Sequence, residues 1–387
     1  MCRTLLLGVE PRSSRCPRSW TGDRVTTGTG TVSQGCPTSS VGVERPPARD
    51  PLLDNAKFLA IALVVVGHAI EPLRDVPAAN SAYMAIYAFH MPVFILIAGY
   101  LSRGFTGARR QARRLLDGVV IPYLVFEISY ELLRDVARGQ EVAVSLLDPS
   151  FAMWFLVALL IWRLTVPLWK AMPPGLAVGV AVVVSMLVPL TDLSGELDLY
   201  RVLGFLPFYV AGLVLPDWYL ELVRMRGVRA LALPVLFGAV FGAYQLTKHG
   251  SLWIYYAKSY EQVGLGAFWG MGNRAAALAL GVVLLTAFLA VVPRRSMWFT
   301  GLGAATMYVY LLHRYVVKGA TSVGLYDAPW LHTVAGTGLV VLLAVAVTLL
   351  LSSPPVVRLA RPFVEPRLDW LLGPSQSRQP EVTRARV

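Results

Sequence analysis

Residues 54–75 read DNAKFLAIALVVVGHAIEPLRD, and the long apolar run inside this stretch decides the fold class. No residue between Phe58 and Gly67 is charged or polar, and the predicted segment 56–74 is long enough to cross roughly 30 Å of hydrocarbon as a helix. A chain inside lipid must pair its backbone N–H and C=O groups with each other, as an α-helix does. The sequence therefore predicts that the chain enters a membrane here.

The composition extends this prediction to the whole chain. Of its 387 residues, 56% are hydrophobic and only 15% are charged, whereas soluble domains carry about 25% charged residues. Apolar segments of similar length recur, so we expect an all-α, polytopic integral membrane helical bundle of about ten transmembrane helices. After 56–74, the predicted spans are 82–101, 115–133, 152–170, 175–190, 203–220, 229–247, 274–292, 299–318 and 331–352.

The basic residues predict the topology. Lys and Arg favour the cytoplasmic side of a membrane, and alternate predicted loops are rich in them. The net charge of +12 does not indicate nucleic-acid binding, because the cations lie in short loops and not in one patch. We expect a multi-pass protein of the plasma membrane with both termini in the cytoplasm. The basic inner loops are Arg103–Arg114, Arg163–Lys170, Arg224–Arg229 and Arg294–Arg295.

Two terminal regions lack long apolar runs. Residues 1–50 are rich in Ser, Thr, Gly, Pro and Arg and are expected to form a disordered cytoplasmic tail, although a mis-assigned start codon would also account for them. Residues 354–387 are expected to be a cytoplasmic C-terminal tail. Cys2, Cys16 and Cys36 all lie in the first tail, so we expect no thiol catalysis in the membrane part.

Four ionisable residues inside predicted spans are the candidates, because a polar group inside the membrane is costly and marks a functional site. At 1.5 Å per residue, His68 lies roughly 18 Å from the inner end of its helix and His90 roughly 12 Å from the outer end. Glu127 and His313 lie roughly 18 Å and 21 Å from the inner ends of theirs. All four are therefore expected at one level, a little outside the midplane. The alternative for each residue is a structural role, in which its side chain only forms a hydrogen bond between helices. We expect no metal site.

Lys57 and His68 are the most specific pair of candidate site residues. Eleven residues correspond to just over three helical turns, so both side chains project from one stripe, about 16 Å apart. Lys57 is placed where a cytoplasmic anion would meet the bilayer, and His68 lies deeper along the same wall. The alternative for Lys57 is ordinary snorkelling at a helix end.

The loop from Arg103 to Arg114 has two compatible interpretations. It is typical of a positive-inside anchor. Arg110 and Arg113 also stand three residues apart, which places them on one helical face suited to a polyphosphate.

Six sequence blocks, in this order, resemble the acyltransferase 3 family of membrane proteins, and especially its fucose 4-O-acetylase-like acetyltransferases. The similarity extends from about Asp54 to Tyr315. The blocks are DNAKFLAIALVVVGHAIEPLRD (54–75), IYAFHMPVFILIAGYLSR (86–103), RRLLDGVVIPYLVFE (113–127), MWFLVALLIWRLTVPLWK (153–170), LYRVLGFLPFYVAGLVL (199–215) and MYVYLLHRY (307–315).

The resemblance implies a transmembrane acyltransferase domain over residues 51–353 that O-acylates carbohydrates on surface or secreted glycans, with acetyl-CoA as donor. The family signature is a basic residue and a histidine separated by ten residues in the first helix, matched by Lys57 and His68. An arginine pair in the next inner loop is also typical, matched by Arg110 and Arg113. The sequence departs from many relatives at Ala98, where they have a serine before the glycine.

These features together predict a mechanism. The CoA phosphates are expected at Lys57, Arg110 and Arg113, and the thioester beside His68, which acts as general base or is transiently acylated. His90 or His313 is expected to orient the sugar or to stabilise the oxyanion.

Trp154 and Arg201 lie near outer helix ends and are expected to bind the glycan. For Trp154, the alternative is the interfacial aromatic belt.

A transporter or flippase for a lipid-linked saccharide or a small polar solute is the alternative function. Intramembrane histidines and a basic inner surface would serve it equally well. Many transporters consist of two related halves. The predicted spans 203–220 and 229–247 contain no counterpart to the histidine-bearing blocks in the spans 56–74 and 82–101.

Overall fold

The computed structural model describes residues 50–141, 144–150, 152–193, 196–246 and 256–366. Within these ranges every regular element is a helix, which confirms the all-α prediction. The expected disordered tail lies almost wholly outside them. The α-helices are α1 (Pro51–Ile70), α2 (Pro77–Leu101), α3 (Arg109–Leu115), α4 (Ile121–Arg138), α5 (Trp154–Leu164), α6 (Val166–Lys170), α7 (Pro174–Leu187), α8 (Leu199–Gly204), α9 (Leu206–Leu213), α10 (Asp217–Arg224), α11 (Arg226–Leu246), α12 (Ala267–Val291), α13 (Thr306–Ser322), α14 (Val334–Leu351) and α15 (Pro354–Val364).

Short helical segments join several of these helices. The segment η2 is one turn of π-helix that runs from α3 into α4, and the others are 3₁₀ turns. They are η1 (Glu71–Leu73), η2 (Leu116–Val120), η3 (Val188–Leu190), η4 (Glu196–Asp198), η6 (Glu261–Val263), η7 (Thr300–Ala305), η8 (Leu325–Asp327) and η9 (Pro329–Leu331).

The first helix begins at a defined cap. Asp50 Oδ1 accepts a hydrogen bond of 2.9 Å from the Leu52 amide, and Pro51 occupies the first helical position, where its missing N–H costs nothing. Buried Asn55 then ties this start to the segment before α13, because its amide donates to the Pro293 and Arg295 carbonyls at 2.8 and 3.0 Å.

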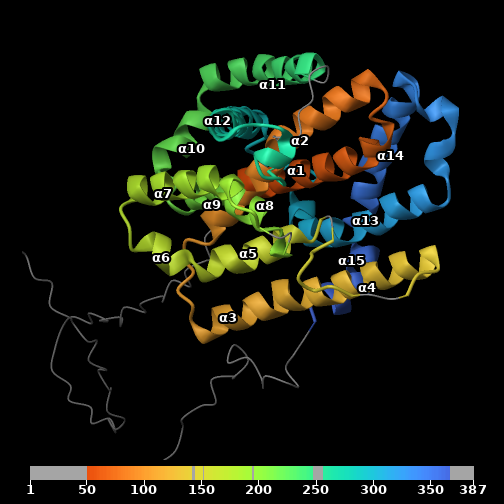
Figure 1. Ribbon diagram of the computed structural model, residues 1–387, viewed down its shortest axis with the longest axis horizontal. Coiled ribbons are helices and arrows are strands. Elements are labelled where there is room, and N and C mark those ends of the chain that lie inside the picture. Colours follow the sequence, from red (N-terminus) through yellow and green to blue (C-terminus); the bar gives the residue numbers. More distant parts are fainter. Residues whose placement is uncertain (1–49, 142–143, 151, 194–195, 247–255, 367–387) are drawn as a thin grey trace, which may run out of the picture. The chain divides into compact units, whose positions relative to one another are not determined.

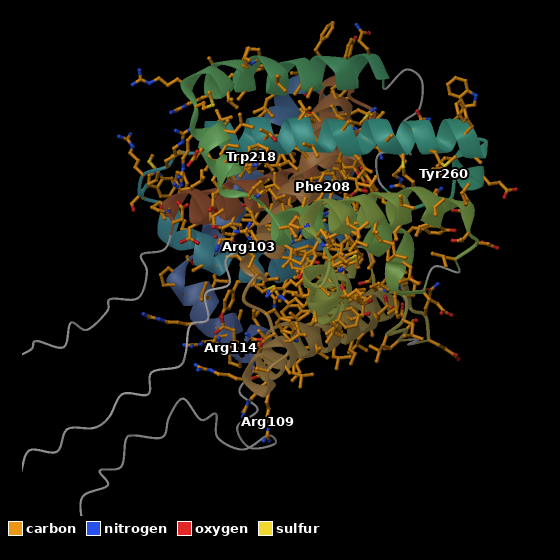
Figure 2. The ribbon with its side chains drawn as sticks, turned by 90° about the vertical axis from the view of Figure 1, so that its left-hand side faces the viewer. Arg103, Arg109, Arg114, Phe208, Trp218 and Tyr260 are labelled. Carbon is orange, nitrogen blue, oxygen red and sulfur yellow. The ribbon has the colours of Figure 1, made fainter. Side chains whose placement is uncertain are left out.

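Helices α1 and α2 lie at the centre of the bundle (Figure 1). Helix α1 packs against α2, α13 and α14, whereas α2 also packs against α9, α11 and α12. Below, the end where α1 begins is called the inner end, and the opposite end the outer end. Arg103 and Trp218 lie toward the inner end and Tyr260 toward the outer end (Figure 2).

The contact between α2 and α9 depends on two glycines. A Cβ atom on Gly99 would lie 2.1 Å from the Tyr209 carbonyl oxygen, and one on Gly212 would lie 2.1 Å from the Leu96 carbonyl oxygen. Both clashes are with backbone, which cannot rotate away as a side chain can. The two helices therefore approach as closely as small residues allow in membrane proteins.

Among the described residues, five helices are long and apolar enough to cross a membrane, and a sixth if α9 and α10 form one span bent by 101°. The five are α1 with η1, α2, α11, α12 and α14. The chain is thus a helical protein with membrane-spanning helices, while the number ten stays a prediction. The segment predicted at 115–133 lies in the continuous α3–η2–α4 helix, and α4 carries five charged residues.

The expected C-terminal tail begins with structure. Helix α15 buries Ala360 and Val364, and it packs against α13 and α4. Its remaining residues, 367–387, lie outside the described ranges. On the other side of the bundle, α11 exposes large apolar side chains such as Phe237 and Phe241, as expected for a helix that faces lipid.

Candidate active site

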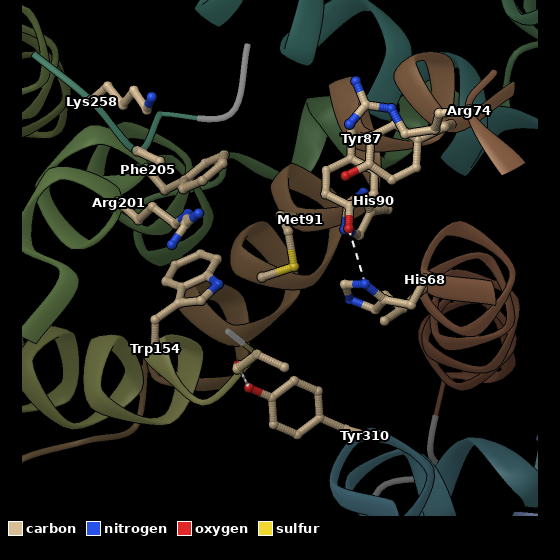
Figure 3. Close-up of a pocket in the computed structure, with 14 residues that line it drawn as sticks. His68, Arg74, Tyr87, His90, Met91, Trp154, Arg201, Phe205, Lys258 and Tyr310 are labelled. Carbon is tan, nitrogen blue, oxygen red and sulfur yellow. Dashed lines mark hydrogen bonds between the residues drawn. The ribbon is translucent and has the colours of Figure 1, made fainter. Parts of the chain in front are cut away.

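His68 lies in the last turn of α1, and its ring is held from two sides. Tyr87 Oη of α2 lies 3.0 Å from His68 Nδ1, as Figure 3 shows. Glu71, one turn after His68, places Oε2 3.6 Å from the same nitrogen. Both oxygens lie at Nδ1, so the ring of His68 is positioned from this side by Tyr87 and Glu71.

The other two intramembrane histidines lie beside this pair. The His68 and His313 rings stack with centroids 5.3 Å apart, and the Tyr87 and His90 rings meet edge to face at 4.7 Å. His90 Nδ1 donates to the Ile86 carbonyl at 2.8 Å, and His313 Nδ1 donates to the Val309 carbonyl at 3.0 Å. Because a carbonyl oxygen only accepts, both Nδ1 atoms carry hydrogen, and each Nε2 is the possible acceptor.

Two cavities meet at this cluster. The first, here the aromatic cavity, has a volume of about 280 Å³, and the second cavity has about 200 Å³. His68 and Ala152 line both. The second cavity is also lined by His313, Arg314 and Lys318. The wall of the aromatic cavity includes Tyr87, His90, Met91, Trp154, Phe205 and Tyr310, with Arg74, Arg201 and Lys258 (Figure 3).

The two residues expected to bind a glycan lie in the aromatic cavity. Trp154 stacks on Phe205 with ring centroids 5.5 Å apart, and the Arg201 guanidinium lies 5.8 Å from the Trp154 ring. Arg201 also bonds to Asp198, three residues earlier in the chain. The structure thus brings Trp154 and Arg201 into the same cavity as His68.

Glu127 lines neither cavity, and its carboxylate instead bonds to Ser150. Its carboxylate is fully buried and accepts hydrogen bonds from the Ser150 amide at 2.7 Å and the Ser150 hydroxyl at 3.0 Å. Arg314 donates to the same hydroxyl at 2.7 Å, and Tyr310 donates to the Ala152 carbonyl. These bonds fix the segment that precedes α5, on which Ala152 lines both cavities.

At the inner end, Lys57 already has a carboxylate partner. Its ammonium lies 2.7 Å from Asp54 Oδ1, and its side chain is 24% exposed. A phosphate that binds Lys57 must compete with this ion pair.

The two arginines expected to bind phosphate are carried by α3. Arg110 is exposed, whereas the Arg113 Nε lies 3.7 Å from Asp117 Oδ2. Arg109 and Arg114 of the same helix project at the edge of the molecule (Figure 2). The described residues include no group of three or more His, Cys, Asp or Glu side chains placed to hold a metal ion.

The sequence prediction missed several residues that touch the cluster. Tyr87 and Glu71 each stand three residues from a candidate histidine, a spacing that places them on its helical face. The sequence could have indicated both residues through this spacing. The contacts of Arg314 and Tyr310 with the segment before α5 join residues about 160 positions apart, which no local pattern reveals.

A family model described as an acyltransferase domain, of the acyltransferase 3 type, matches residues 50–349. The chain belongs to the acyltransferase 3 family. This finding confirms the resemblance identified from the six sequence blocks. It also means that the cavities at His68 lie within the acyltransferase domain.

Two nodulation proteins named NolL are similar to parts of the chain. NolL of Mesorhizobium japonicum is 42% identical over 60 residues, which cover 14% of this chain and 16% of that protein. NolL of Sinorhizobium fredii is 33% identical over 136 residues, which cover 32% of this chain and 37% of that protein. The matched part thus spans less than half the length of these relatives. No solved structure matches the chain.

Proposed function

We propose that the chain is a membrane-embedded O-acyltransferase that moves an acyl group, acetyl in particular, from acyl-CoA at the cytoplasmic face to a carbohydrate hydroxyl of a surface or secreted glycan. The observation that supports this most directly is the position of His68. It lies where two cavities of an acyltransferase domain meet, with Nδ1 held by Tyr87 and Glu71.

In this proposal His68 acts as general base. Its Nε2 takes the proton of the acceptor hydroxyl, and the sugar oxygen attacks the thioester carbonyl carbon. The new C–O ester bond forms, the C–S bond breaks, and the departing CoA thiolate takes up the proton from His68. Atoms and charges balance without a further reactant.

The donor is proposed to bind from the inner end. Its phosphates bind Lys57, Arg110 and Arg113, with Asp54 displaced from Lys57. The pantetheine arm then follows α1 over the roughly 16 Å that separate Lys57 from His68. Such an arm can span this distance in an extended form.

The acceptor is proposed to occupy the aromatic cavity. Trp154 offers a flat face on which a sugar ring can stack, and Arg201 offers donors to its oxygens. His90, which lines this cavity and has its Nδ1–H held by a carbonyl, can accept a hydrogen bond from a second sugar hydroxyl at Nε2. His313 lines the second cavity, which also reaches His68.

The test is acyl transfer in membrane vesicles supplied with labelled acetyl-CoA. His68→Ala is expected to reduce transfer roughly 10²- to 10⁴-fold, because a general base is lost. Lys57→Ala is expected to raise the KM for acetyl-CoA, whereas Arg226→Ala, an exposed inner-end cation outside the proposed site, is expected to leave it unchanged.

Full transfer by His68→Ala would exclude the catalytic role. Saccharide uptake by the vesicles without acyl transfer would favour the transporter. Mass spectrometry of surface glycans with and without the gene identifies the acceptor by a lost acyl mass.

A further inference from the structure

The aromatic cavity carries an excess of positive charge. Three cationic side chains that the structure describes line it, and they come from separate parts of the chain: Arg74 after η1, Arg201 in α8 and Lys258 before η6. None of the other described residues that line this cavity is acidic. A neutral sugar does not require three cations around it.

Two of these three cations have no carboxylate partner among the described residues. Arg201 bonds to Asp198. Arg74 instead lies 4.6 Å from the centroid of the Tyr83 ring and donates to Asn80 Oδ1 at 3.3 Å. Lys258 is exposed and forms no ion pair with a residue in the described ranges. Of the three cations, only Arg201 therefore has a carboxylate partner among the described residues.

The backbone that carries Lys258 is held against the cavity. Tyr256 is buried and stacks on Phe205 with ring centroids 4.3 Å apart. Tyr256 is also contacted by Arg274 of α12, whose guanidinium lies over the Tyr256 ring, 4.2 Å from its centroid. Lys258, two residues on, is thereby kept at the rim of the cavity whose wall Phe205 forms.

Membrane anchoring does not account for these cations. Arginine and lysine that set topology gather at the cytoplasmic side, which the loop charges predict to be the inner end with Arg109, Arg110 and Arg114. Arg74 and Lys258 lie at the outer end, beyond the end of α1 and before the start of α12. Their common feature is the cavity that they line.

We propose that the aromatic cavity binds an acidic saccharide, whose carboxylate or phosphate group lies among Arg74, Arg201 and Lys258 while its ring stacks on Trp154. A volume of about 280 Å³ suits one sugar ring with a charged substituent. The identification of this saccharide as the acyl acceptor rests on the proposed function, whereas the binding of its acidic group is independent of that function.

The experiment measures binding by calorimetry to the purified full chain in lipid nanodiscs. One pair of probes is tetragalacturonate and its fully methyl-esterified form, which share a skeleton and differ in charge. A second pair is maltotetraose with and without a 6-phosphate, which separates phosphate from carboxylate recognition. We expect at least one acidic probe to bind roughly tenfold more tightly than its neutral partner, since charge-assisted hydrogen bonds to an anion are stronger than neutral ones.

Matched variants locate the effect. Arg74→Gln and Lys258→Gln are each expected to remove most of the preference for the acidic probe, because both side chains are exposed and can change without unfolding the bundle. Arg138→Gln, an exposed cation at the same end that does not line the cavity, is expected to retain it. Added salt is expected to weaken only the acidic probe.

Equal affinity within both probe pairs, or no binding of any probe, would overturn the proposal. So would equal loss in the Arg138→Gln control. Acyl transfer is measured separately in vesicles, so a chain that transfers acetyl to neutral saccharides would retain the proposed function and lose this inference. A chain that binds acidic saccharides but does not transfer acetyl would retain this inference and lose the proposed function.

Discussion

At the scale of the residue, Glu127 shows how a buried charge can shape a cavity without lying in it. Both carboxylate oxygens accept from Ser150, and Arg314 donates to the same serine. The sequence indicated a catalytic candidate at this depth, but these bonds favour a positioning role. Glu127 holds the segment with Ala152, which forms part of the wall of both cavities.

We predict that Glu127→Gln raises the KM for the acceptor and leaves kcat close to that of the wild type. A glutamine oxygen accepts from one Ser150 donor, while its amide faces the other donor, so the segment before α5 loosens. An unsatisfied buried group costs about 1–3 kcal/mol, which corresponds to a KM change of roughly 5- to 150-fold. Steady-state kinetics in vesicles measures both constants.

Glu141→Gln, at an exposed site after α4, is the control and is expected to behave as the wild type. If Glu127→Gln lost kcat as severely as His68→Ala with an unchanged KM, Glu127 would belong to the chemistry.

At the scale of the element, the cavities depend on helices that pack closely and on loops that are tied together. The α2–α9 contact at Gly99 and Gly212 sets the position of α2, and hence of Tyr87 and His90. At the outer end, His332 links two loops, because its Nδ1 lies 2.8 Å from Asp75 Oδ2 and its Nε2 lies 2.8 Å from the Tyr326 carbonyl.

We predict that Gly212→Ala destabilises the protein. Its Cβ would lie 2.1 Å from the Leu96 carbonyl oxygen, so α2 and α9 must move apart, at a cost of about 1–3 kcal/mol for overpacking. Gly238→Ala in α11 is the matched control, because no atom lies within 4 Å of the added Cβ. Thermal unfolding in detergent measures both, and an unchanged Tm for Gly212→Ala would contradict the close contact.

The His332–Asp75 pair predicts a pH dependence. The Tyr326 carbonyl and Asp75 raise the pKa of His332 above 6.5, and the bond to His332 lowers the pKa of Asp75 below 3.8. The His332 contribution to stability is complete below pH 6.5 and is lost as pH rises through its raised pKa. The Asp75 contribution is complete above pH 3.8 and is lost as pH falls through its lowered pKa.

The stabilisation by this pair is therefore complete between about pH 4 and pH 6.5. We expect the difference in Tm between wild type and Asp75→Asn to be largest in this window and to shrink toward pH 9. A difference that grew steadily with pH would contradict the assignment. Because Asp75 is exposed and His332 is partly exposed, added salt is expected to reduce the difference.

At the scale of the whole molecule, the proposed reaction needs a donor at one face and an acceptor at the other. Lys57 and His68 lie at opposite ends of α1, and the aromatic cavity opens among outer-end segments. The orientation of the bundle in the membrane therefore determines whether cytoplasmic acyl-CoA reaches the Lys57 end.

We predict that the start of α11 is cytoplasmic and the segment after it is not. In a background with Cys2, Cys16 and Cys36 changed to Ser, an impermeant maleimide added to intact cells should label Gln262→Cys and spare Arg226→Cys. Both positions are exposed and should label after permeabilisation. The opposite pattern would place Lys57 outside and exclude cytoplasmic acyl-CoA as its ligand.

Much of the fold followed from local properties of the chain. Apolar runs determine where helices form, because their backbone must be paired inside lipid, and the segments predicted at 56–74 and 82–101 coincide with α1 and α2. Helix ends were less accurate, as α12 begins at Ala267 and not near 274. The predicted span at 203–220 is divided by a bend of 101° between α9 and α10. An apolar run predicts a helix but does not show whether the helix axis is straight.

The pair Lys57 and His68, and the family motifs around it, are readable from the sequence by itself, because helix geometry relates residues eleven positions apart. The tertiary structure decided which distant groups surround His68. Tyr87, His313 and the Ser150–Ala152 wall come together through packing between helices, and Arg74, Arg201 and Lys258 come together through loops far apart in the chain. These contacts depend on the free energy of packing the entire bundle, which cannot be derived from any single segment of the sequence.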